Sequence, residues 1–158
     1  MDSADDLLAI DCPLLFADNN PKFQYVRKQE RHQFFTGNLN QFFHLLNESG
    51  TFNEHVQSDQ KAFELYRISF SYFVQRLTYR EKELTKQDKE LGKQQLKEKI
   101  DIYLPKVICF VVKMSCQSFL RKKSVNFGLA GDYNGISVHC LPRPCCKNRM
   151  FSYDVKLA

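Results

Sequence analysis

The feature that most constrains the fold is a periodic row of large apolar side chains in the middle of the chain. Its members are spaced by three, four, three and four positions, which is the period of a helix with one face turned into a core. They are Phe63, Tyr66, Phe70, Phe73 and Leu77. We therefore expect one long helix over residues 58–83.

A second apolar row lies on the opposite side of the same expected helix. At about 100° per residue, its members fall in an arc of their own, which serine, threonine and arginine separate from the first. The second row consists of Leu65, Ile68, Tyr72 and Tyr79. A helix with two apolar rows needs two neighbours. The second row therefore predicts contact with another helix, self-association, or docking of another protein.

Shorter patterns before and after this segment predict further helices. Phe35, Leu39, Phe42 and Leu46 predict a helix over about residues 30–47 that stops at Ser49-Gly50. Thr51 and Glu54 have the spacing of a capping box, with the next helix beginning later, near Ser58. Residues 80–99 are highly charged and predict a solvated helix end, a loop around Gly92 and the start of another helix. Residues 100–121 fit a buried helix, which we favour, or a buried strand.

The last third of the chain favours β-structure. Asn134-Gly135 is the dipeptide of a type I′ turn and predicts a hairpin that joins residues 125–133 to residues 136–140. Residues 151–157 alternate apolar and polar side chains, which is typical of a half-buried strand. Together these patterns predict a mainly α fold: a small helical bundle around one long aromatic-rich helix, with a small antiparallel β appendage at the C-terminus.

The 158 residues suit one domain, or one domain with an appendage. We expect an acidic, hydrophobic tail or arm over residues 1–29, a helical domain over residues 30–123, and a small basic region with cysteines over residues 124–158. Residues 7–11, Leu-Leu-Ala-Ile-Asp, resemble the clathrin-box pattern. That resemblance implies that the tail docks on a partner through Leu7, Leu8 and Ile10. The alternative is that these side chains pack back on the core.

Positive charge gathers toward the C-terminus. Residues 106–158 contain nine basic and two acidic side chains, whereas residues 30–105 contain eleven of each. A basic region with interleaved aromatic residues is compatible with single-stranded nucleic acid, although a solvated basic surface explains it as well. The candidate nucleic-acid contacts are Arg121, Lys122, Lys123, Arg143, Lys147 and Arg149.

The densest group of potential metal ligands consists of His139, Cys140, Cys145 and Cys146. Zinc prefers four such ligands in two short pairs, and the second pair is missing here. Zinc is therefore possible, but we favour ordinary buried thiols and expect no cofactor.

Function must be inferred without a catalytic motif. The sequence contains neither the Lys-Ser/Thr of a P-loop nor a GxGxxG fingerprint, and nothing marks a nucleophile with its base. The acidic first residues are unlike a signal peptide, and the longest apolar run, residues 107–112, is too short to span a membrane. We expect a non-catalytic protein-interaction or regulatory module in the cytoplasm or nucleus. A nucleic-acid-binding accessory protein is the alternative, and a zinc-stabilised domain is the third candidate.

Overall fold

The computed structural model describes residues 6–21, residue 34 and residues 41–144. These residues form a mixed five-stranded sheet with the strand order β2-β1-β3-β5-β4. All neighbouring strands are parallel except β4 and β5, which are antiparallel. The strands are β1 (Leu15–Asp18), β2 (Ser69–Tyr72), β3 (Val107–Phe110), β4 (Gly128–Tyr133) and β5 (Ile136–Cys140).

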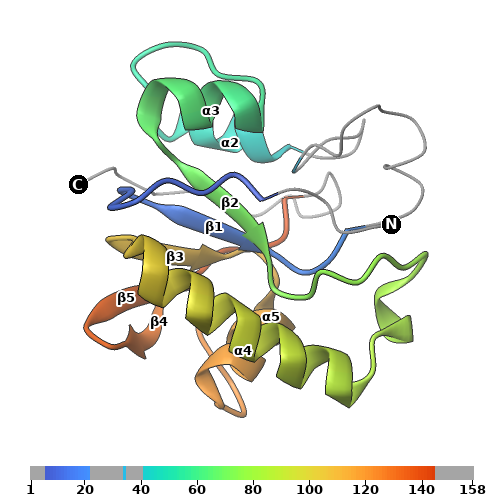
Figure 1. Cartoon of the computed structure of the whole chain (residues 1–158). Coiled ribbons are helices and arrows are strands. Elements are labelled where there is room, and N and C mark those ends of the chain that lie inside the picture. Colours follow the sequence, from blue (N-terminus) through green and yellow to red (C-terminus); the bar gives the residue numbers. More distant parts are fainter. Residues whose placement is uncertain (1–5, 22–33, 35–40, 145–158) are drawn as a thin grey trace.

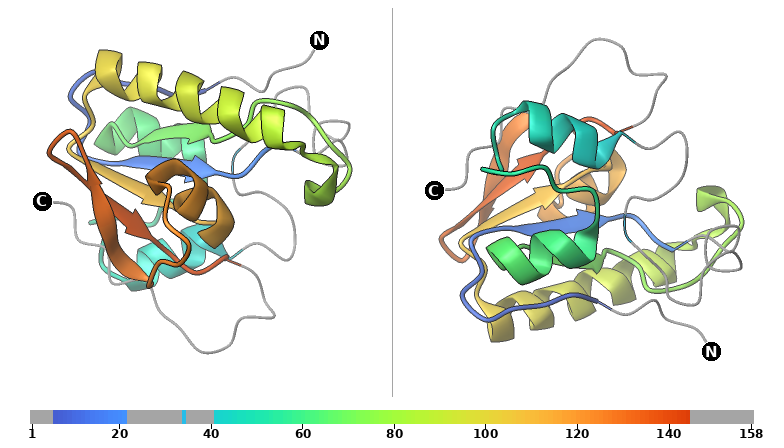
Figure 2. Two further views of the ribbon diagram at one scale, coloured as in Figure 1. Left: turned by 90° about the horizontal axis from the view of Figure 1, so that it is seen from below. Right: turned by 90° about the horizontal axis from the view of Figure 1, so that it is seen from above.

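Helices cover both faces of this sheet, so the described part of the chain has three layers (Figure 1). Two helices, α2 (Phe42–Glu48) and α3 (Asp59–Tyr66), lie on one face. The other face carries α4 (Lys86–Tyr103) and α5 (Lys113–Leu120). Figure 2 shows the same arrangement from the two sides of the sheet. A short 3-10 turn, η1 (Glu81–Glu83), leads into α4.

The central strands β1 and β3 are largely apolar because both of their faces are buried. Leu14 and Phe16 belong to the core beneath α2 and α3, whereas Leu15 and Ala17 belong to the core beneath α4 and α5. Aromatic rings fill the first core: the Phe16 and Phe42 ring centroids lie 4.8 Å apart in an edge arrangement. The sheet therefore sits between two separate hydrophobic cores.

The expectation of a mainly helical bundle is wrong, because residues 58–83 do not form one helix. Helix α3 ends at Tyr66, where Arg67 takes a left-handed conformation with φ 57°. The chain then forms β2, where Phe70 and Tyr72 join the same core as Ile68, the residue just before the strand. Phe73 belongs to the opposite core. The period of two in this short segment therefore prevails over the helical period.

Three further expectations need correction. Leu15–Asp18, in the expected N-terminal tail, form β1, which pairs with both β2 and β3 inside the sheet. Val107–Phe110 form strand β3 rather than a buried helix, although Lys113–Leu120 are helical. Gly92 does not mark a loop, because it lies inside the continuous helix α4.

Several local signals correctly predicted the structure. Gly50 follows α2 with φ 78°, as expected for a stop at Ser49-Gly50, and α3 begins at Asp59, next to the expected start near Ser58. The Ser58 side chain, rather than Thr51, caps this helix by accepting a hydrogen bond from the backbone N–H of Lys61. The hairpin between β4 and β5 turns at Asn134 and Gly135, which both have positive φ, as a type I′ turn requires. The expected helix before residue 41 falls largely outside the described residues, and the strand at residues 151–157 falls wholly outside them.

Both edges of the sheet are protected. Leu7 exchanges two backbone hydrogen bonds with Phe70 on the β2 edge, at 2.9 and 2.7 Å. On the β4 edge the pairing with β5 is irregular between Leu129 and Gly131, and the Lys122 ammonium donates to the Ala130 carbonyl at 2.7 Å. A bulge and a lysine both discourage pairing with another chain. Among the described residues, no helix is long and apolar enough to cross a membrane.

Candidate functional site

A cavity of about 380 Å³ opens at the carboxyl ends of the parallel strands. The chain leaves β1 toward the α2–α3 layer and leaves β3 toward α5 in the opposite layer. The crevice between two such strands is a topological switch point, where open α/β sheets bind their ligands. The cavity is lined by Asn19, Phe73, Glu81, Lys82, Leu84, Lys89, Val112, Met114 and Ser115.

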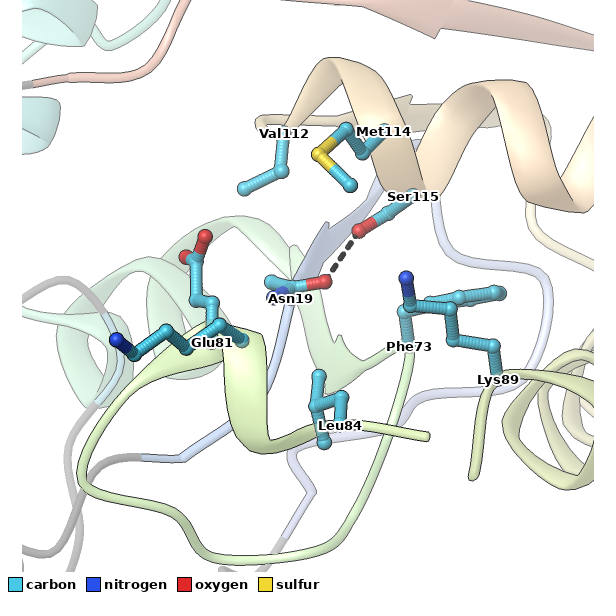
Figure 3. Close-up of a pocket in the computed structure, with 9 residues that line it drawn as sticks. Asn19, Phe73, Glu81, Leu84, Lys89, Val112, Met114 and Ser115 are labelled. Carbon is cyan, nitrogen blue, oxygen red and sulfur yellow. Dashed lines mark hydrogen bonds between the residues drawn. The ribbon is translucent and has the colours of Figure 1, made fainter. Parts of the chain in front are cut away.

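A buried pair of polar side chains joins the two halves of this cavity. The Ser115 hydroxyl, in the first turn of α5, donates to Asn19 Oδ1 at 2.6 Å (Figure 3). Asn19 and Ser115 are only 9% and 2% exposed. The position of Asn19 is held by its own backbone, since its N–H donates to Asp18 Oδ1 and its carbonyl accepts from the N–H of Val74. The pair therefore links the end of β1 to the start of α5.

The next residue, Asn20, anchors the loop that forms the lower rim. Its Nδ2 donates to the Thr78 hydroxyl at 2.7 Å and to the Arg76 carbonyl at 3.0 Å. The Thr78 N–H in turn donates to the Pro21 carbonyl at 3.2 Å. These bonds hold the segment before η1 against the end of β1, which places the η1 residues of the lining beside Asn19.

The remaining walls of the cavity consist of apolar side chains and of the backbone at the start of α5. Phe73, Leu84 and Val112 are buried side chains that line it, and Met114 is largely exposed at its mouth. Helix α5 begins at this wall without a side-chain cap at Val112. A helix start of this kind presents backbone N–H groups and a partial positive charge. The cavity therefore offers an apolar surface beside hydrogen-bonding groups.

The residues predicted to bind a partner protein are not brought together. Ile68 and Tyr72 are buried in the core, whereas Leu65 on α3 and Tyr79 in the loop before η1 are each 52% exposed. They share no helix face because the long helix is absent. Docking of this chain on another protein, or on a second copy, remains a prediction.

The motif that resembles the clathrin box is largely folded onto the sheet. Leu7 packs against the core beneath α2 and α3, and Leu8 against the core beneath α4 and α5. Ile10 is 56% exposed, and its carbonyl accepts a hydrogen bond from the Arg67 guanidinium. Leu7 and Leu8 therefore pack back on the core, which is the alternative stated for this motif.

The basic residues of the nucleic-acid alternative lie on different elements. Arg121 and Lys123 are exposed at the end of α5, and Lys122 is bonded to the β4 edge. Arg143, beyond β5, forms an ion pair with Glu81 at 2.9 Å. Lys147 and Arg149 fall outside the described residues. This arrangement leaves binding of nucleic acid a prediction.

The candidate metal ligands are separated by the strand that carries them. His139 and Cys140 are neighbours in β5, so their side chains point to opposite faces of the sheet. Cys140 is buried and is hydrogen-bonded to the Cys116 thiol, a contact that, together with burial, raises the pKa of Cys116. Within the part of the chain that the structure describes, no three His, Cys, Asp or Glu side chains are placed to hold a metal. Cys145 and Cys146 lie outside it.

The sequence interpretation did not single out the residues that line the cavity. The available signal was the polar triplet Asp18-Asn19-Asn20 directly after the apolar residues 14–17. Polar side chains at the carboxyl end of a parallel strand are typical of a binding edge. That signal is readable only once residues 15–18 are recognised as a strand. No protein-family model matches the chain, and no curated protein is significantly similar to it.

Proposed function

We propose that the chain is a non-catalytic binding module that holds a small organic ligand in the cavity at the carboxyl ends of β1 and β3. The observation that carries this proposal is the buried Asn19–Ser115 pair at the topological switch point. Small-molecule sites are concave and mostly apolar, with a few convergent polar groups, and usually have volumes of about 300–1,000 Å³. The cavity meets each of these criteria.

The polar pair favours binding over catalysis. The Ser115 hydroxyl donates its proton to an amide oxygen, which is a poor base, so its oxygen is not activated as a nucleophile. The described residues that line the cavity include no histidine or cysteine. The amide of Asn19 retains donor capacity at Nδ2, whose contact with Asn20 Oδ1 is 3.3 Å. A ligand that offers an acceptor to this amide would be oriented without being transformed.

The test is a fragment screen on the ¹⁵N-labelled full chain by NMR. Ligands that use this site should shift the Ser115 backbone signal and the Asn19 side-chain amide signals together. Ser115→Ala should weaken such binding at least several-fold. Ser124→Ala removes an exposed hydroxyl and should leave the affinity unchanged. Fragments that shift only signals remote from β1 and α5 would contradict the proposal.

A further inference from the structure

The acidic side chains around the cavity are all engaged elsewhere. Glu81 forms its ion pair with Arg143. Glu83 Oε2 accepts from the backbone N–H groups of Tyr79 and Arg80, at 2.7 and 2.8 Å, and the bond from Arg80 is the main cause of its lowered pKa. Asp88 Oδ2 accepts from the Thr85 N–H at 2.8 Å and from Arg76 at 2.6 Å. None of these carboxylates is left to neutralise a nearby lysine.

Two lysines line the same cavity, and within the described residues neither ammonium group has an ion-pair or hydrogen-bond partner. Lys82 belongs to η1 and Lys89 to the second turn of α4. Lys89 is partly buried, and Figure 3 shows its side chain extending toward the Asn19–Ser115 hydrogen bond. Two ammonium groups that no carboxylate among the described residues neutralises leave positive charge at the cavity, and positive charge attracts anions. The electrostatics of the cavity therefore favour an anionic ligand.

We propose that the ligand is a small organic phosphate of mononucleotide size; this inference rests on the proposed binding function. A phosphate monoester carries about −1.5 to −2 charges at neutral pH, which matches two unpaired lysines. The uncapped start of α5 adds backbone N–H donors suited to the same group. The body of the ligand would contact Phe73, Leu84 and Val112, which are apolar. A cavity of about 380 Å³ lies near the lower end of the range for ligand sites, which favours a mononucleotide over a dinucleotide.

The experiment compares AMP, adenosine and inorganic phosphate as probes of the full chain in NMR titrations. AMP should bind at least ten-fold more tightly than adenosine, with shifts at Ser115 and Asn19. Its affinity should fall when the salt concentration rises from about 50 to 300 mM, because salt screens the charge contribution. GMP, CMP and UMP test whether the phosphate, rather than one base, carries the affinity.

Variants separate specific contacts from net charge. Lys82→Ala and Lys89→Ala should each reduce the preference for AMP over adenosine at least three-fold, and Lys89→Gln serves if the alanine variant unfolds. Lys106→Ala is the matched control, because Lys106 is exposed at the amino end of β3, on the opposite edge of the sheet. An equal loss in the control would overturn the inference.

The outcomes distinguish the inference from the function on which it rests. If neutral fragments or adenosine shift the cavity signals as strongly as AMP, the phosphate inference is overturned and the binding site stands. The same conclusion follows if neutral fragments bind there and none of the four nucleotides does. If neither fragments nor nucleotides shift these signals at millimolar concentration, both proposals fail.

Discussion

Gly92 illustrates how one residue determines the approach of a helix to the sheet. A Cβ atom at this position would lie 2.2 Å from the Phe73 carbonyl oxygen and 3.1 Å from the Val74 side chain. Glycine costs about 1 kcal/mol relative to alanine inside a helix, which is why its presence suggested a loop. Close packing of α4 against the end of β2 requires it nevertheless. The same contact positions Phe73 and α4 at the wall of the cavity.

The Gly92→Ala substitution should destabilise the protein by roughly 3 kcal/mol, because backbone rather than a flexible side chain must move to accommodate the methyl group. Urea unfolding followed by circular dichroism measures the effect. Gln94→Ala, at an exposed position of the same helix, is the control and should change stability by less than about 0.5 kcal/mol. A Gly92→Ala protein as stable as the parent would show that α4 does not pack this closely.

At the scale of the element, α4 is stabilised at its start by a capping box. The Thr85 hydroxyl accepts from the Asp88 N–H at 3.1 Å, and the Asp88 carboxylate accepts from the Thr85 N–H. The pKa of Asp88 is lowered, chiefly by that backbone hydrogen bond and further by Arg76. Because Arg76 lies in the loop after β2, this carboxylate also connects the helix to the rim of the cavity.

The lowered pKa of Asp88 makes the capping contribution pH-dependent. The ionised carboxylate stabilises the fold fully above its unfolded pKa of about 3.8, and this stability is lost as the pH falls through the lower folded pKa. Asp88→Asn should therefore cost about 0.5 kcal/mol at pH 7, since this partly exposed pair is screened by solvent. The difference from the parent should shrink as the pH falls below the unfolded pKa of about 3.8.

Urea unfolding at several pH values checks this expectation. Thr85→Ser retains the capping hydroxyl and should follow the parent curve at every pH. A constant deficit of Asp88→Asn down to pH 2 would mean that the carboxylate is not preferentially ionised in the folded state.

At the scale of the whole molecule, one sheet is shared by two cores. Ile68 is fully buried in the core beneath α2 and α3, and Ile108 is fully buried in the core beneath α4 and α5. Both β1 and β3 contribute side chains to the two cores. If one layer lost its packing, the strands on which the other layer packs would therefore be exposed on one face. We therefore expect the described fold to unfold as one cooperative unit.

The matched substitutions Ile68→Val and Ile108→Val test this cooperativity. Each should destabilise the protein by about 1 kcal/mol. Each should also shift the unfolding midpoints of NMR probes in α2 and α4 by the same amount. Ile102→Val removes one methylene from an exposed side chain and should change the stability of the protein little. Separate midpoints for the two helices would show that the layers unfold independently.

The sequence correctly predicted features that depend on neighbouring residues. Asn134-Gly135 predicted its turn and Ser49-Gly50 the end of α2, because a positive φ is a property of a few adjacent positions. The helix expected over residues 58–83 was wrong because a strand of four residues is too short for its alternation to be told from a helical period. Phe70 fits both the helical row and the alternation with Ile68 and Tyr72. Only the pairing with β1 decides between helix and strand.

The candidate site could not be predicted for a related reason. Its lining combines Asn19, residues 73–89 and residues 112–115, which lie far apart in the chain. They meet because β2 and β3 pair with opposite sides of β1. This strand order has no local signature in the sequence. By itself, the sequence determined the hairpin turn, the end of α2 and the abundance of buried aromatic residues. The tertiary structure alone decided which segments became strands and where their carboxyl ends converge, because long-range pairing overrides local helical preference once both faces of a strand are buried.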